Sequence, residues 1–184
     1  MSRILRVIAA VIGAVVVLLL AAAIILPRIF RARMSHPGPI GARNVRMLNT
    51  AQVMYSSTYP EQGFAPNLAV LGPDRPDATN TDCQPSPTHA CLIDAKIGCS
   101  KGTSSAWCAD NLYRYNVQSS SSTPPYKDYW ITATPLQPGP EKKNYCATPD
   151  AVLRSEQGAP LSRPYTLDEC KRLQIDSSVT YRPD

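Results

Sequence analysis

The longest apolar run of the chain extends from Val7 to Leu26 and contains neither a charged side chain nor a side-chain hydrogen-bonding group. The run is continuous, whereas a half-buried strand or an amphipathic surface helix requires polar positions at regular intervals. A helix of these twenty residues would be ~30 Å long, which matches the hydrocarbon thickness of a bilayer. Arginines flank the run, at Arg3 and Arg6 and again from Arg28 onward. The pattern predicts a transmembrane anchor within residues 1–35, with residues 7–26 in the lipid.

A cleaved secretory signal peptide is the alternative interpretation of this segment. Such a peptide also begins with a charged stretch and an apolar run, and Ala21–Ala23 would offer a small-residue cleavage site. However, Ile24–Leu26 extend the apolar run beyond these alanines, and the run is long for a signal peptide. These two features favour the anchor.

A second helix is predicted from Ile40 to about Tyr59, after the prolines and glycine of His36–Pro39 interrupt the chain. Within it, apolar residues recur at three- and four-residue steps and form one stripe that needs a surface to pack on. The stripe includes Val45, Leu48, Ala51 (or Gln52) and Tyr55, whereas Arg43, Arg46 and Asn49 are expected to lie largely off it. We call this predicted helix the stem.

Short strands are predicted later in the chain, at residues 111–117, 126–134, 143–147 and 151–154. Short loops separate them, so an antiparallel meander of about four strands is expected. Residues 64–72 are expected to form a turn or short helical piece, and residues 92–97 a short helix. Thr166–Glu169 matches a capping box, which predicts a short final helix carrying Cys170.

Six cysteines lie outside the predicted anchor, at Cys83, Cys91, Cys99, Cys108, Cys146 and Cys170. An even number of widely spaced cysteines in a membrane-tethered domain indicates disulfides and an oxidising compartment. A metal site would need closer pairs, and here the nearest two cysteines are eight positions apart. Pairing of sequence neighbours, as Cys83–Cys91, Cys99–Cys108 and Cys146–Cys170, is a hypothesis among fifteen possible connectivities.

These elements predict an α+β fold. It comprises an N-terminal transmembrane helix, and a helical stem that packs on a small antiparallel sheet with disulfide-stapled loops. Residues 1–35 would be the membrane anchor with basic flanks, and residues 36–184 one exported globular domain.

The net charge of +5 comes from the predicted membrane flanks, since residues 1–35 hold five arginines and no acid. From residue 36 onward the remaining fourteen lysines and arginines (19 minus 5) balance fourteen acidic residues. An electrically neutral domain gives no reason to expect nucleic acid as a partner.

No catalytic, cofactor or metal motif is found in the sequence. Gly-x-Ser-x-Gly is absent, and Asp74, Asp77 and Asp82 do not have the spacing of a calcium loop. His89 near Cys91 would allow a thiol–imidazole pair, but a disulfide at Cys91 is the favoured alternative. We therefore expect no enzymatic activity, cofactor or metal.

Residues 43–60 (RNVRMLNTAQVMYSSTYP) and 63–72 (GFAPNLAVLG) resemble a stretch of bacterial type IV pilin-like proteins and pseudopilins. Further similarities follow in the same order: Cys83 with residues 91–94, the segment 129–133 with a Pro-Gly after it, and residues 144–154. Pro27 with residues 31–34 also resembles the family's anchor. The resemblance covers most of the chain to about residue 155.

The chain departs from the family at its N-terminus. Pilin precursors carry a processing glycine and a glutamate five residues into the mature chain, which pairs with the N-terminal amine of a neighbouring subunit. Counting back from Pro27, these positions fall near Leu5 and Ala10, so neither residue is present. The difference places processing and ordinary filament assembly in question.

The resemblance implies a non-enzymatic subunit or accessory protein of a type IV pilus or type II secretion system. It would reside in the bacterial inner membrane with a single pass, held by residues 7–26, and its C-terminal domain would lie in the periplasm or at the cell surface. Its expected partners are the membrane and other pilin-like subunits or pilus and secretion components. The alternative is a membrane-anchored exported binding domain with a pilin-like fold that does not enter filaments.

Overall fold

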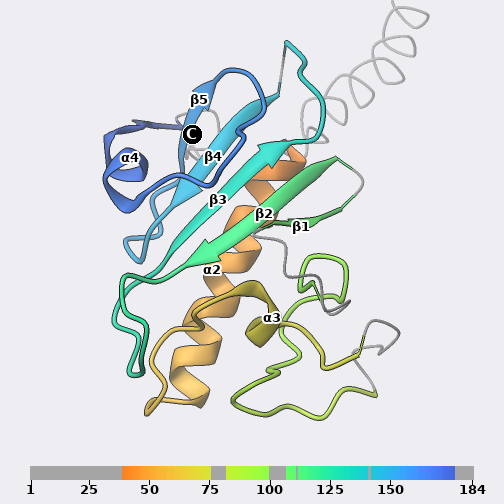
Figure 1. Ribbon diagram of the computed structural model, residues 1–184, viewed down its shortest axis with the longest axis vertical. Coiled ribbons are helices and arrows are strands. Elements are labelled where there is room, and N and C mark those ends of the chain that lie inside the picture. The colour runs from red at the N-terminus through yellow and green to blue at the C-terminus, as the bar shows by residue number, and fades with distance from the viewer. Residues whose placement is uncertain (1–38, 76–81, 100–106, 111, 141, 177–184) are drawn as a thin grey trace, which may run out of the picture. The chain divides into compact units, whose positions relative to one another are not determined.

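The computed structural model describes residues 39–75, 82–99, 107–110, 112–140 and 142–176. These residues form a six-stranded antiparallel sheet with a long helix on one face (Figure 1). The strands are β1 Cys108–Ala109, β2 Tyr113–Gln118, β3 Trp130–Pro135, β4 Lys143–Ala147, β5 Arg154–Gln157 and β6 Gln174–Ile175. Each strand pairs with its neighbours in sequence. The predicted α+β class and antiparallel meander are confirmed.

The sheet has two more strands than the alternating pattern predicts. β1 and β6 contain two residues each, which is too few to display an alternation, and each pairs with one longer neighbour. β5 begins at Arg154, where the predicted strand ends, because residues 148–151 form a turn that Ala151 N–H closes by donating to Thr148 O at 2.9 Å. In this turn Ala151 has φ +57°, and Val152 N–H donates to Asp150 Oδ1 at 3.0 Å.

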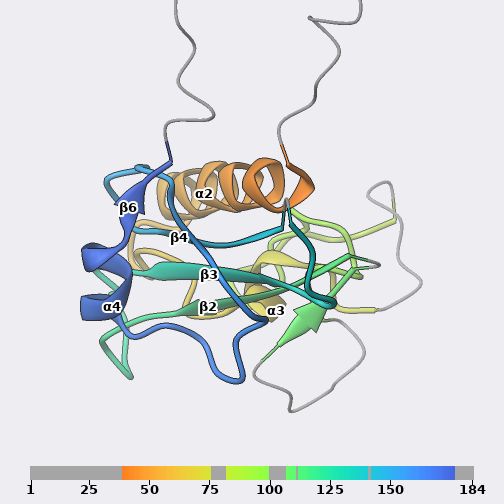
Figure 2. The same cartoon turned by 90° about the horizontal axis from the view of Figure 1, so that it is seen from above.

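Helix α2, Ile40–Thr58, packs along one face of the sheet (Figure 2). It corresponds to the predicted stem and ends one residue earlier. A Cβ on Gly41 would lie 2.6 Å from the Tyr113 ring and 2.9 Å from the Tyr145 ring. The first turn of α2 therefore approaches the sheet at a distance that a larger residue would prevent.

The core lies between α2 and the sheet. Alternate residues of β2, β3 and β4 point into it: Tyr113, Tyr115, Val117, Ile131, Ala133, Tyr145 and Ala147. The remaining residues of these strands point to the opposite face, in agreement with the period of two in a strand. The sheet therefore has one face for α2 and a second, more polar face.

Helix α3, Leu68–Leu71, is a single turn that contributes Leu68 and Leu71 to the core. The expectation of a short helix at residues 92–97 is wrong, because this segment forms turns. Asp94 Oδ1 accepts hydrogen bonds from the backbone N–H groups of Lys96 and Ile97, at 2.8 and 3.0 Å. This N-cap interaction begins a single turn at Asp94, which Gly98 N–H closes by donating to Asp94 O at 2.9 Å.

A C-terminal strap, residues 158–166, covers the second face of the sheet. Tyr165 N–H donates to Thr132 Oγ1 (3.3 Å), and Leu161 N–H donates to Thr134 Oγ1 (2.9 Å). Asn144 Nδ2 donates to the carbonyl oxygen of Ala159 (3.0 Å). Strand side chains thus satisfy the backbone of a segment that has no regular secondary structure.

Helix α4, Leu167–Arg172, follows the strap and begins with the predicted capping box. Thr166 Oγ1 accepts from Glu169 N–H at 3.3 Å, and Glu169 Oε2 accepts from Thr166 N–H at 2.7 Å. Cys170 of α4 is buried and bonds to Cys146 of β4. The helix is thereby held to the sheet.

Within the ranges given above, no helix combines the length and the apolar character needed to cross a bilayer. The predicted anchor, residues 7–26 within 1–35, lies outside the described residues.

Candidate functional site

The inner face of α2 carries the predicted stem-packing residues. Val45 and Leu48 have no exposed surface, and Tyr55 is 1% exposed. The Tyr55 hydroxyl extends past the core and donates to the carbonyl oxygen of Pro87 at 2.7 Å. These three residues therefore anchor α2 to the domain itself, and they are not accessible to a partner.

Three amide side chains lie on the same inner face: Asn44, Asn49 and Gln52. Asn49 is buried, which corrects the expectation that it lies off the stripe, and its Oδ1 accepts from the Tyr129 hydroxyl at 3.0 Å. Gln52 donates to Ala65 O (3.0 Å) and accepts from Ala65 N–H (2.8 Å). An apolar periodicity does not detect such residues, since each is buried only because a specific partner satisfies it.

Asp110 connects α2 to the loop before β2. One carboxylate oxygen accepts from Asn44 Nδ2 (3.1 Å) and the Tyr115 hydroxyl (2.9 Å), and the other from two backbone N–H groups, of Leu112 and Tyr113. Burial raises the pKa of Tyr115, and the bond to Asp110 raises it further, although the bond from Asn44 acts in the opposite direction. The Tyr115 hydroxyl therefore remains a donor at physiological pH.

The outer face of α2 exposes several large apolar side chains. Ile40 and Met47 are 37% exposed, Met54 is 51% exposed and Val53 is 56% exposed. Ile40, Met47 and Met54 recur every seven residues and thus share one side of the helix, which we call the outer stripe. Because the opposite side of α2 is already packed on the sheet, the helix presents apolar surface in two directions.

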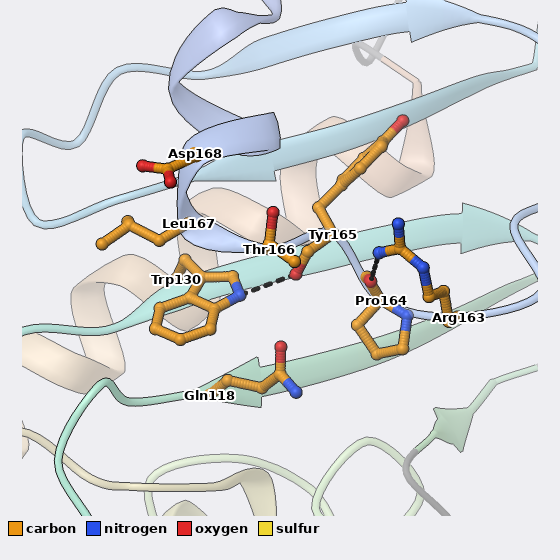
Figure 3. Close-up of a pocket in the computed structure, with 8 residues that line it drawn as sticks. All are labelled: Gln118, Trp130, Arg163, Pro164, Tyr165, Thr166, Leu167 and Asp168. Atoms are coloured by element: carbon orange, nitrogen blue, oxygen red, sulfur yellow. Dashed lines mark hydrogen bonds between the residues drawn. The ribbon is translucent and has the colours of Figure 1, made fainter.

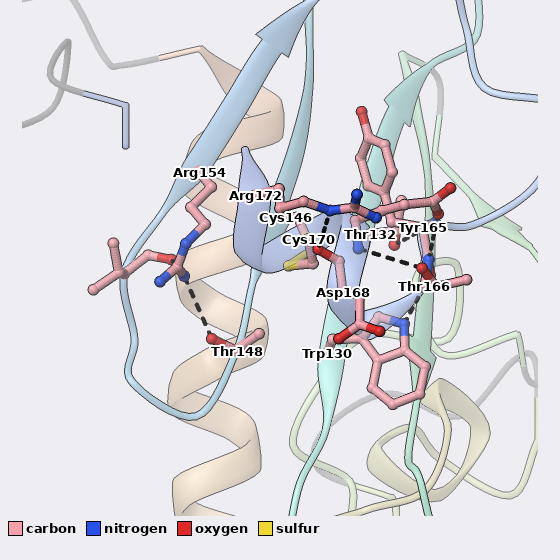
Figure 4. The surroundings of a disulfide bond; sticks show 12 residues. Trp130, Thr132, Cys146, Thr148, Arg154, Tyr165, Thr166, Asp168, Cys170 and Arg172 are labelled. Atoms are coloured by element: carbon pink, nitrogen blue, oxygen red, sulfur yellow. Dashed lines mark hydrogen bonds between the residues drawn. A yellow bond between two sulfur atoms is a disulfide. The ribbon is translucent and has the colours of Figure 1, made fainter. Parts of the chain in front are cut away.

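All six predicted cysteines are in disulfides, paired as Cys83–Cys91, Cys99–Cys108 and Cys146–Cys170. The Cα–Cα distances are 6.0, 5.2 and 5.6 Å, within the usual range for disulfides. The first two disulfides close loops of the segment between α3 and β2, and the third joins α4 to the sheet beside Trp130 and Tyr165 (Figure 4).

Neither a metal cluster nor a thiol–imidazole pair of Cys91 and His89 is found among the described residues. No group of three or more His, Cys, Asp and Glu side chains in the described part of the chain is placed to hold a metal ion. Cys91 is bonded to Cys83, so it has no thiol for a pair with His89, whose Nδ1 lies 3.2 Å from Thr88 Oγ1. The surface of α2 is thus the strongest functional candidate.

Comparisons with known proteins add no assignment. No protein-family model matches the chain, and no curated protein or solved structure matches it significantly.

Proposed function

We propose that this chain is a non-enzymatic pilin-like subunit or accessory protein of a type IV pilus or type II secretion system. In this proposal residues 7–26 hold the chain in the bacterial inner membrane, and α2 packs laterally against the helix of another pilin-like subunit. The sheet domain, on the periplasmic or outer side, is then displayed to the surroundings.

The outer stripe is the observation that carries the proposal. Water-exposed methionine and isoleucine side chains at heptad spacing are typical of a helix that packs against a second helix. Arg43 and Arg46 lie on the exposed surface of the same helix, so a partner with acidic groups would gain favourable charge contacts. The resemblance of residues 43–60 to pilin-like proteins falls on this helix.

The proposal is tested by photo-cross-linking of the full chain in its native membrane. A photoreactive p-benzoylphenylalanine replaces Met47 or Met54, whose exposed side chains permit the change without altering the core. We expect covalent adducts with another pilin-like subunit or a pilus or secretion component, identified by mass spectrometry.

Leu136 provides the matched control position. It is also a large apolar residue, 44% exposed, and it follows β3 rather than lying on α2. Adducts at Met47 and Met54 that are absent at Leu136 support the proposal. If neither α2 position yields such an adduct, or if Leu136 yields the same ones, the proposed role of α2 is wrong.

The second candidate is a membrane-anchored exported binding domain that never enters a filament. The residues Leu5 and Ala10, at the positions of the family's processing glycine and glutamate, favour this alternative. The two functions differ in one fractionation experiment: recovery of the protein with sheared surface filaments would exclude the binding domain, whereas complete retention in the cell membrane would exclude incorporation into filaments.

A further inference from the structure

A shallow depression of about 590 Å³ lies at the ends of β2 and β3 that adjoin their connecting loop. Its volume is within the range of small-molecule sites. Gln118 and Trp130 form its floor, while Pro164, Thr166, Leu167 and Asp168 line the other side (Figure 3). Gln118 and Trp130 are register partners and point away from α2, because Val117 and Ile131 point into the core.

The Trp130 ring is held in a fixed position. Its Nε1–H donates to the carbonyl oxygen of Tyr165 at 2.8 Å, and the ring packs against the buried cluster of Tyr165, Cys146 and Cys170. The disulfide between these cysteines joins α4 to β4. Separation of α4 from β4 would therefore require breaking the disulfide, and separation of the strap from the ring would break the hydrogen bond between Trp130 and Tyr165.

Hydrogen-bonding groups border this ring without being used by the fold. The side chains of Gln118 and Asp168 make no hydrogen bond within the described residues, and both line the depression (Figure 3). The amide can donate and accept, and the carboxylate accepts. Such polar groups next to one rigid apolar surface fix the orientation of a bound ligand.

The charges at the depression disfavour an anion. Arg163 donates to Glu169 Oε1 and Oε2 at 2.6 and 2.8 Å, and to its neighbour's carbonyl oxygen at 3.0 Å. Its charge is thus compensated, and Asp168 adds a carboxylate on the same rim. Tyr165 also lines the depression but is buried. Trp130 therefore offers the accessible aromatic face, whereas a flat aromatic ligand is held best between two such faces.

We propose that this depression binds a neutral saccharide. The C–H face of a sugar ring would lie on the Trp130 indole, and two of its hydroxyl groups would bond to the Gln118 amide and the Asp168 carboxylate. The second ligand face would remain in water, which suits a polyhydroxylated molecule better than an apolar one. The site lies on the face of the sheet opposite α2, so the inference is independent of the proposed assembly function.

The test monitors the fluorescence of Trp130. Trp107 and Trp130 are its two tryptophans, so Trp107→Phe leaves Trp130 as the sole indole fluorophore. The full chain is purified in a polyoxyethylene detergent, because glycoside detergents themselves carry sugars. Lactose, maltotriose, cellotriose and the N-acetylglucosamine trimer are titrated, with Trp130 emission and saturation-transfer NMR as readouts.

We expect at least one saccharide to bind with a millimolar or lower Kd, and to shift Trp130 emission. Gln118→Ala and Asp168→Ala should each weaken binding by roughly 3- to 10-fold, as expected for one hydrogen bond, with an unchanged thermal midpoint. Raising the salt concentration should leave the affinity within about twofold, since the ligand is uncharged.

Three outcomes would overturn the proposal. The first is that no saccharide of the panel binds at concentrations up to about 10 mM, because the Kd would then be weaker than the expected millimolar value. The second is binding that Gln118→Ala and Asp168→Ala leave unchanged. The third is tighter binding of adenosine or sialyllactose, which would assign the depression to a planar or an anionic ligand.

Discussion

Gln52 shows how a polar residue becomes part of a protein core. The side chain has no exposed surface and bonds to both backbone groups of Ala65. The side chain thus supplies the hydrogen-bond partners of the Ala65 backbone, in the segment that follows α2. Its contribution to stability is the free-energy cost of leaving the buried N–H and carbonyl groups of Ala65 unpaired when the side chain is removed.

We predict that Gln52→Leu lowers the free energy of unfolding by about 2–4 kcal/mol, because a buried N–H and a buried carbonyl of Ala65 lose their partner. Urea denaturation measures the change. Thr50→Leu on the exposed side of the same helix is the matched control and should change stability by less than about 0.5 kcal/mol. Equal effects of the two substitutions would refute the argument.

Asp150 controls the turn between β4 and β5 through its charge. Arg154 donates to it from Nη2 at 2.6 Å, and this hydrogen bond is the main reason that the pKa of Asp150 is lowered from 3.8 to about 2. Thr148 and Val152 N–H act in the same direction, and partial burial opposes them. A lowered pKa means that the ionised carboxylate stabilises the folded state.

The stabilisation by Asp150 is therefore fully present above its ordinary pKa and is lost as the pH falls toward about 2. Its side chain is 43% exposed, so we expect Asp150→Asn to cost only about 0.5–1 kcal/mol at pH 7. Thermal unfolding of both proteins between pH 7 and pH 2 measures the difference, which should vanish at the acid end. A difference that stays constant over this range would contradict the predicted role of the charge.

At the scale of elements, the strap and α4 are attached to the sheet by hydrogen bonds and one disulfide. Cys146–Cys170 closes a loop across a sequence separation of 24 residues, and both cysteines have no exposed surface. The strap itself is held by hydrogen bonds from Thr132, Thr134 and Asn144. The disulfide thus cross-links α4 to β4, in addition to the main-chain connections of this segment to β5 and β6.

Removal of this bond in Cys146→Ala/Cys170→Ala should lower the free energy of unfolding by about 3 kcal/mol, on the chain-entropy estimate for a loop of this length. Hydrogen exchange should also increase in residues 165–173 before the rest of the domain opens. The matched control is the double variant Cys83→Ala/Cys91→Ala. It removes a disulfide that closes a shorter loop, with a separation of 8 residues, and it should leave hydrogen exchange in α4 unchanged. Equal hydrogen exchange in α4 of both double variants would show that the Cys146–Cys170 disulfide is not what holds α4 to the sheet.

At the scale of the whole molecule, the first question is where the mature chain begins. Leu5 and Ala10 occupy the positions at which type IV pilin-like proteins, which the sequence resembles, carry a processing glycine and a glutamate. An apolar run long enough to span a bilayer follows directly.

We predict that the membrane-extracted protein retains residues 1–26 and that its intact mass increases by the mass of six hydrogens on reduction, two for each of three disulfides. The unreduced and reduced masses are measured on one preparation. A chain beginning near Arg6 would indicate processing of the pilin type. A chain beginning after Ala23 would identify the apolar run as a signal peptide.

The features that the sequence alone predicts are those with a local physical cause. The period of Val45, Leu48 and Tyr55 predicts α2, alternation predicts β2 and β3, and Thr166 with Glu169 predicts the start of α4. For the cysteines, the sequence leaves neighbour pairing as one hypothesis among fifteen connectivities, and the structure contains this pairing.

The tertiary structure decided what depends on partners distant in sequence. Asn49 is buried because Tyr129 reaches it, and Gln52 because Ala65 does. β1 and β6 are strands only through their neighbours, and Trp130 borders a depression only because residues 158–166 fold back across the sheet. A sequence pattern records the preference of each segment, whereas these features arise from long-range contacts that form together when the chain folds.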